Sequence, residues 1–132
     1  MDGLHLTADL RGCDPQRRSM SDPAALRSAC IAAVERAGLS PVGELFHRFP
    51  APGGVTGVVL LAESHLAVHT WPELAAATLD VYVCNYGSDN TARARLLLDT
   101  LIAAFAPAGV ERQALHRGSS VQASRPVAEA GT

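Results

Sequence analysis

The chain has 132 residues, of which 48% are hydrophobic and only 5% aromatic, and its formal net charge is −2. This length corresponds to one domain, and the charge argues against a surface that binds nucleic acid or an anionic membrane. All 11 basic residues are Arg. Chemistry that needs a lysine Schiff base, including pyridoxal phosphate (PLP) catalysis, is therefore excluded.

The first half of the chain alternates between strand and helix signals. Residues 4–10 alternate in polarity and predict a strand, and the polar residues 11–21 predict a loop. Asp22 and Pro23 suit the N-cap and first position of a helix, which Gly38 would end. A second strand is expected over residues 42–49, followed by a turn rich in Pro and Gly.

The second half predicts three strands, a helix and a final strand. Residues 55–62 are apolar and β-branched, as in a buried strand, and shorter strands are expected at 66–70 and 79–84. Asp89 or Asn90 would cap a helix that runs to about Phe105, and residues 110–117 suit an edge strand. Residues 119–132 are predicted to be a disordered tail, which leaves residues 1–118 as a single domain.

Consecutive strands with short connections favour antiparallel pairing. We therefore expect an α+β two-layer sandwich, with a mostly antiparallel sheet and two helices on one face. The other face should be bare and rich in Val and Leu, and a bare apolar face usually indicates a partner. The pattern predicts a homodimer formed through the sheet.

The three cysteines, Cys13, Cys30 and Cys84, are an odd set without C-x-x-C spacing. This argues against a disulfide framework and a structural zinc site. The sequence also has no apolar stretch near the roughly 18 residues of a membrane span. We expect a cytoplasmic protein with reduced thiols and no membrane association.

The segment ESHLAVHTWPE, residues 63–73, contains the densest chemistry in the chain. On a strand His65 and His69 would lie about 13 Å apart at ~3.3 Å per residue, too far to share an ion, so no metal is expected. Ser64 lacks the G-x-S-x-G elbow of a hydrolase. These polar residues could also simply line a half-buried strand.

Another possibility starts from the Glu63–Ser64 peptide bond. A serine hydroxyl in a strained turn can attack the preceding carbonyl, which converts the amide into an ester. β-Elimination then cuts the chain and leaves a dehydroalanine that hydrolyses to a pyruvoyl group. This ketone is an electron sink that needs no lysine and no PLP.

Residues 56–73 closely resemble the processing site of the short prokaryotic S-adenosylmethionine decarboxylases. Further similarity lies in residues 5–13, 46–49 and 80–84 and in the late Arg117-Gly118. The resemblance spans about residues 4–118, and it implies a self-cleaving proenzyme. The products would be a β chain of residues 1–63, ending at Glu63, and an α chain of residues 64–132.

The resemblance also implies roles for individual residues. Ser64 would become the pyruvoyl group that forms a Schiff base with the substrate. His69 would be the proton donor in processing, with assistance from Thr56. Cys84 would be the general acid that reprotonates the substrate after decarboxylation.

For substrate binding, the resemblance implies that Phe49 and His69 flank the adenine and that Glu73 holds the ribose hydroxyls. The substrate would be S-adenosylmethionine, and the product the aminopropyl donor for spermidine synthesis. On a regular strand Ser64 and His69 point to opposite faces and lie about 16 Å apart at ~3.3 Å per residue. His69 would therefore serve a partner's Ser64, so we expect a dimer of αβ units with shared active sites.

Two alternatives remain open. The chain departs from the family pattern at residues 74–78 and at Asn85, near the substrate pocket. Some relatives with the same machinery decarboxylate arginine or ornithine, and Glu73 could pair with a guanidinium. An unprocessed, non-catalytic homologue acting as a regulatory subunit is the second alternative.

Overall fold

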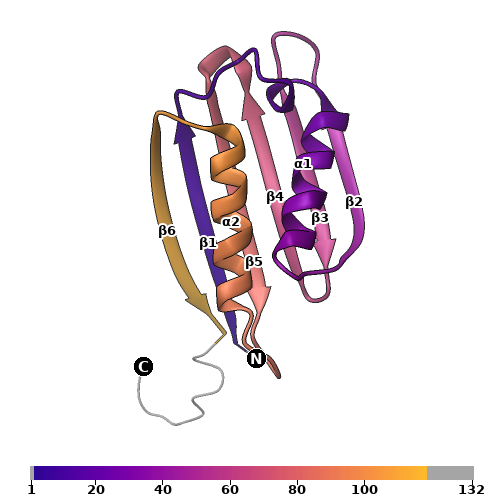
Figure 1. Ribbon diagram of the computed structural model, residues 1–132, viewed down its shortest axis with the longest axis vertical. Helices are drawn as coiled ribbons and strands as arrows, with labels where there is room; N and C mark the ends of the chain where they lie inside the picture. Colours follow the sequence, from indigo (N-terminus) through magenta and orange to yellow (C-terminus); the bar gives the residue numbers. More distant parts are fainter. Residues whose placement is uncertain (1, 119–132) are drawn as a thin grey trace.

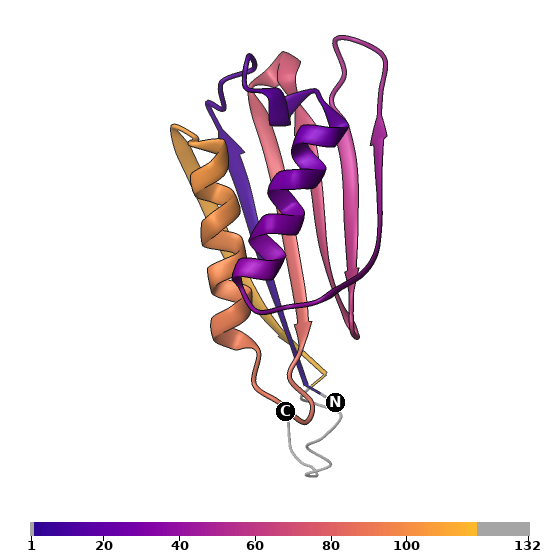
Figure 2. The same cartoon turned by 45° about the vertical axis from the view of Figure 1, so that its right-hand side comes forward.

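The computed structural model describes residues 2–118, so the tail predicted at 119–132 lies outside the described residues. One six-stranded sheet carries two helices on one face (Figures 1 and 2). The predicted α+β sandwich is confirmed. No helix of the described part is long and apolar enough to cross a membrane. The elements are β1 (Gly3–Arg11), α1 (Pro23–Arg36), β2 (Pro41–Arg48), β3 (Val55–Leu61), β4 (Ser64–Trp71), β5 (Ala76–Cys84), α2 (Thr91–Phe105) and β6 (Gly109–Arg117).

All neighbouring strands are antiparallel, in the order β2-β3-β4-β5-β1-β6. Strands β2 to β5 follow each other along the chain, whereas β1 is inserted between β5 and β6. Gly3 pairs with Cys84 on one side and with Arg117 on the other. The first strand thus places the ends of β5 and β6 at one end of the sheet.

The core lies between the sheet and the helices. Alternate residues of β1, β3, β4 and β5 are buried, as expected for strands with one covered face. The helices contribute apolar stripes that include Leu26, Val34, Leu97 and Phe105. Each fully buried Leu or Phe contributes about 1.5–3 kcal/mol. This packing fixes which residues of each strand point away from the helices.

The helix boundaries follow local signals. The Asp22 carboxylate accepts a hydrogen bond of 3.0 Å from the Ala24 N–H, and Gly38 has φ +79° just after α1. At the start of α2, the Asp89 carboxylate accepts a 2.9 Å hydrogen bond from the Thr91 N–H. Asn90 occupies the N-cap position, but its side chain makes no capping bond. Its amide points elsewhere, as described below.

The open face differs from the prediction. It carries no helix in the described part of the chain, but it is not rich in Val and Leu. Strand alternation turns most of those residues toward the helices, and the open face is left with mainly polar and aromatic side chains. In the middle strands the polar and aromatic ones are His5, Thr7, Asp80, Tyr82, His65, His69 and Thr56, which lie beside Ala67, Val58 and the exposed Leu60.

Two strands begin two or three residues earlier than the sequence indicated. β4 begins at Ser64 rather than residue 66, and β5 begins at Ala76 rather than residue 79. Ala76 pairs with both Trp71 and Arg11, because β5 is a central strand. Pairing on both sides overrides the weak β-propensity of alanine.

Candidate active site

The Glu63–Ser64 bond lies in a tight turn between β3 and β4. Leu61 pairs with Ser64, so only Ala62 and Glu63 form the connection. Glu63 has φ +53°, a left-handed conformation that costs a non-glycine residue about 1–2 kcal/mol. The peptide bond implicated in cleavage therefore follows a strained, exposed residue.

Ser64 is held against the end of β5. The β4–β5 ladder ends at the pair His65–Tyr82. Beyond this pair the Cys84 N–H donates a 3.1 Å hydrogen bond to Ser64 Oγ. The serine hydroxyl thus takes the place of a backbone acceptor and keeps its own proton available for transfer.

A cavity of about 270 Å³ opens at this end of the sheet, lined by Glu63, Tyr82, Cys84 and Tyr86. Tyr82 and Cys84 have the same strand parity, so both belong to the open face. The Tyr82 ring stacks on His65 at 5.9 Å, and the Arg117 guanidinium lies 5.3 Å from its centroid. Sequence reasoning missed Tyr82, although its position two residues before Cys84 placed it on the same face.

Gly3 provides the space for Tyr82. A Cβ at Gly3 would lie 2.2 Å from the Tyr82 hydroxyl oxygen. The absence of a side chain at Gly3 thus leaves room for the Tyr82 ring beside the cavity. Any larger residue at this position would displace Tyr82.

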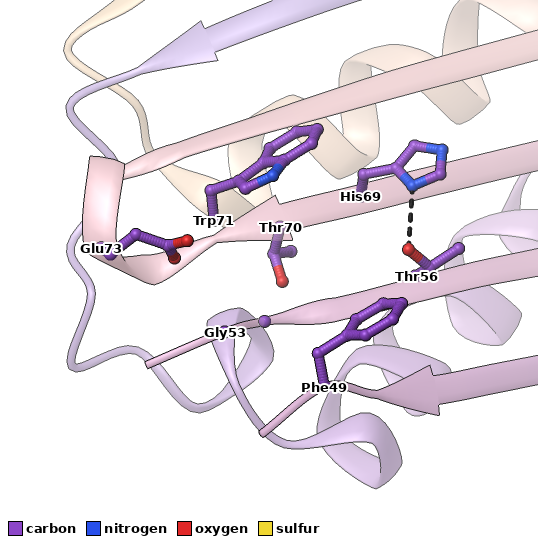
Figure 3. A pocket seen from close by; sticks show the side chains of 8 residues that line it. Phe49, Gly53, Thr56, His69, Thr70, Trp71 and Glu73 are labelled. Atoms are coloured by element: carbon purple, nitrogen blue, oxygen red, sulfur yellow. Dashed lines mark hydrogen bonds between the residues drawn. The ribbon is translucent and has the colours of Figure 1, made fainter. Parts of the chain in front are cut away.

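The opposite end of the same strands holds a second cavity of about 340 Å³ (Figure 3). Thr56 and His69 lie directly opposite on β3 and β4, and the threonine hydroxyl is 3.0 Å from His69 Nδ1. The remaining lining residues are Phe49, Gly53, Gly54, Thr70, Trp71 and Glu73. The structure therefore brings together Phe49, Thr56, His69 and Glu73 from the predicted set.

Thr70 fixes the wall of this second cavity. Its buried hydroxyl accepts a 2.9 Å hydrogen bond from the Val55 N–H and donates one of 2.8 Å to the Met20 carbonyl. A Cβ at Gly54 would lie 2.2 Å from the Thr70 carbonyl oxygen, so the turn after β2 needs glycine there. Thr70 is thus a satisfied structural residue.

The two groups of predicted residues do not meet within one chain. Ser64 and His69 lie at opposite ends of β4, about 16 Å apart at ~3.3 Å per residue. Cys84 and Glu63 lie with Ser64, whereas Thr56, Phe49 and Glu73 lie with His69. The two groups of site residues therefore lie at opposite ends of the sheet.

Cys13 and Cys30 are buried and have low thiol reactivity. Burial raises the pKa of the Cys30 thiol to about 12 and also raises that of Cys13. Cys84 is only half-buried, and all three thiols are free. Within residues 2–118, no group of three His, Cys, Asp or Glu side chains could hold a metal ion.

These features define a class of small α+β protein with a strained Glu–Ser turn and two cavities at opposite ends of one sheet. A family model described as S-adenosylmethionine decarboxylase matches residues 4–118. The chain belongs to this family.

Individual relatives support this family membership. An S-adenosylmethionine decarboxylase proenzyme of Aquifex aeolicus is 38% identical over 116 residues, which are 88% of this chain and 81% of the relative. One of Picrophilus torridus is 37% identical over 91% of this chain and 87% of its own length.

Solved structures show the same fold. The crystal structure of the adenosylmethionine decarboxylase from Aquifex aeolicus matches with a TM-score of 0.78 and 37% identity, over 88% of this chain and 90% of that one. A Trypanosoma brucei AdoMetDC monomer, 16% identical over 83% of this chain and 44% of its own, matches with a TM-score of 0.55. At that identity the second match concerns the fold alone.

Proposed function

We propose that this chain is a pyruvoyl-dependent S-adenosylmethionine decarboxylase that cleaves itself between Glu63 and Ser64. Its product would be the aminopropyl donor for spermidine synthesis. The observation that carries the proposal is the strained Glu63 turn, whose serine hydroxyl is fixed beside Cys84. Family membership and the second group of residues around His69 support it.

The residues at Ser64 fit the formation of a pyruvoyl group. Ser64 Oγ attacks the Glu63 carbonyl carbon, the peptide C–N bond breaks, and the hydroxyl proton passes to the nitrogen. Release of the left-handed backbone at Glu63 favours this shift. When present, the group supplies a carbonyl electron sink for decarboxylation.

The remaining steps, which are substrate binding and proton transfer, fall to side chains of this chain. Cys84, half-buried in the first cavity, is placed to give a proton to the substrate α-carbon. Phe49 offers an aromatic surface for an adenine, and Glu73 offers oxygens that can accept hydrogen bonds from ribose hydroxyls. His69, joined to Thr56 by a hydrogen bond, handles the proton in the elimination that cuts the chain.

We also propose that the active unit is a homodimer whose open faces pack together. The midpoint between Ser64 and His69 lies between Leu66 and Ala67. A two-fold axis across β4 at this point would bring residue 64 of one chain near residue 69 of its partner. Ala67 presents a small side chain at the crossing. This arrangement completes two active sites per dimer. We place the protein in the cytoplasm.

Intact mass measurement tests self-cleavage. The purified chain should separate into residues 1–63 and 64–132, the latter beginning with a pyruvoyl group. Ser64→Ala should remain one chain of 13.8 kDa. If the wild-type chain also remains uncleaved, the enzyme proposal fails and the regulatory-subunit alternative stands.

Release of carbon dioxide tests the substrate. S-adenosylmethionine, arginine and ornithine should be assayed side by side with the processed protein. We expect turnover of S-adenosylmethionine alone. Turnover of arginine or ornithine in its place would reassign Glu73 to a substrate cation.

A further inference from the structure

The loop after β5 holds the backbone of Cys84 at its carbonyl group, next to the N–H that contacts Ser64. Asn90 Nδ2 donates a 2.9 Å hydrogen bond to the Cys84 carbonyl oxygen. The Asn90 N–H donates in turn to Asn85 Oδ1 at 2.7 Å. Cys84 is therefore clamped through both of its backbone polar groups, with Ser64 on one and Asn90 on the other.

The orientation of the Asn90 amide is fixed by its second partner. Arg93 Nη1 donates a 2.9 Å hydrogen bond to Asn90 Oδ1. Arginine can only donate, so the amide oxygen must face Arg93 and the NH₂ group must face the Cys84 carbonyl. The Asn90 side chain thus binds the Cys84 carbonyl instead of capping α2, and the Asp89 carboxylate accepts a hydrogen bond at the helix start in its place.

We infer that Asn90 is a positioning residue for self-cleavage, holding the Cys84 N–H against the oxygen that leaves during β-elimination. The inference rests on the proposed function. After the acyl shift, Ser64 Oγ is the ester oxygen that joins Cβ to the Glu63 carbonyl carbon. It is the same atom that accepts the hydrogen bond from Cys84.

The electron balance of the elimination shows why this hydrogen bond matters. β-Elimination needs a base at Ser64 Cα. His69 of the partner subunit in the proposed dimer therefore accepts this proton, rather than acting as the proton donor that the resemblance implied. The Cα–H electron pair forms the Cα–Cβ double bond, and the Cβ–Oγ pair leaves with Oγ as part of the Glu63 carboxylate. One water later converts the dehydroalanine to the ketone and releases ammonia.

Negative charge therefore develops on Oγ while the Cys84 N–H points at it. A fixed donor to such an oxygen stabilises the transition state, and loss of one donor typically costs about 10²–10³ in rate. Asn90 acts one step away through the Cys84 backbone, so its removal should slow elimination by about tenfold or more. In the preceding acyl shift Oγ is the attacking atom and the peptide nitrogen is the leaving group. That step therefore does not depend on charge leaving with Oγ, and it should proceed.

The test compares Asn90→Asp with Asn90→Ala in the full chain. Both remove the amide donor to Cys84, and the Asp variant keeps the side-chain size. We expect cleavage to slow by about tenfold or more in each and the ester to accumulate. Hydroxylamine cuts such an ester and leaves an α chain that begins with intact Ser64, which mass measurement distinguishes from a pyruvoyl terminus.

Asp89→Ala is the matched control. It removes the hydrogen bond to Thr91 at the same helix start but leaves Cys84 untouched. We expect Asp89→Ala to cleave at nearly the wild-type rate without trapped ester, even where its melting temperature falls as far as that of Asn90→Ala.

The outcomes separate the two proposals. A wild-type chain that never cleaves refutes the proposed function. A wild type that cleaves, together with Asn90 variants that cleave equally fast without ester, refutes the role of Asn90 alone. Equal slowing in Asp89→Ala would also overturn it, because the effect would then come from the helix start.

Discussion

Thr56 and His69 face each other across β3 and β4, and their side chains are joined by a 3.0 Å hydrogen bond on the open face of the sheet. The ring nitrogen that contacts Thr56 is Nδ1, so Nε2 is left to act on another group. The ring also lies 5.9 Å from Trp71. A neighbour on the next strand thus sets the orientation of the imidazole.

Replacement of Thr56 should slow processing without unfolding the protein. Thr56→Val keeps the shape but removes the hydroxyl that orients His69, and we expect self-cleavage to slow by about ten- to a hundredfold. Thr56→Ser retains the hydroxyl and should cleave at close to the wild-type rate. Gel or mass measurement of cleavage over time checks both. Equal rates for Val and Ser would show that the hydrogen bond has no part in processing.

Mixed dimers should recover the activity that two single variants lack. Ser64→Ala and His69→Ala should each fail to cleave alone. If the sites are shared, co-expression pairs Ser64 of the His69→Ala chain with His69 of the Ser64→Ala chain. The His69→Ala chain alone should then be cut, as distinct affinity tags and mass measurement can show. An absence of cutting in a verified mixed dimer would place each site within one chain.

Substitution of Cys84 should separate cleavage from turnover. Cys84→Ala keeps the backbone N–H that contacts Ser64 Oγ, so we expect self-cleavage to continue. Loss of the thiol should lower decarboxylation by about 10²–10⁴-fold, the usual contribution of a general acid. Cleavage and carbon dioxide release are measured on the same preparation. Full turnover in the variant would contradict the assigned role.

The thiols should differ sharply in reactivity. Burial raises the pKa of Cys30 to about 12, and Cys13 is shifted in the same direction. Both stay protonated at pH 8, so iodoacetamide should label Cys84 first, as peptide mass mapping can determine. Because the Cys30 pKa is raised, its contribution to stability is present below pH 9, the ordinary thiol value, and is lost as the pH rises toward 12. Cys30→Ala should remove this part of the alkaline loss.

Local signals in the sequence determined most of the helices and strands and identified the segment that carries the cleavage site. Asp22 and Gly38 bound α1 where expected, and local apolar and alternating patterns located the strands, because caps and strand patterns depend on near neighbours. The segment 63–73 identified the family for the same reason, since its residues are contiguous. The extension of β5 back to Ala76 was not predicted, because it depends on pairing with β1 and β4.

Tertiary structure decided which residues join each end of the site. Strand spacing in the sequence already separated Ser64 from His69, but only strand pairing brings Cys84 to Ser64 and Thr56 to His69. The open face proved polar and aromatic because the covering helices take up the Val and Leu side chains. Asn90 reaches Cys84 only because the loop after β5 folds back on the strand end. The identity of the site residues could be predicted from the sequence. Their partners could not, because they depend on contacts between distant segments, which no local pattern encodes.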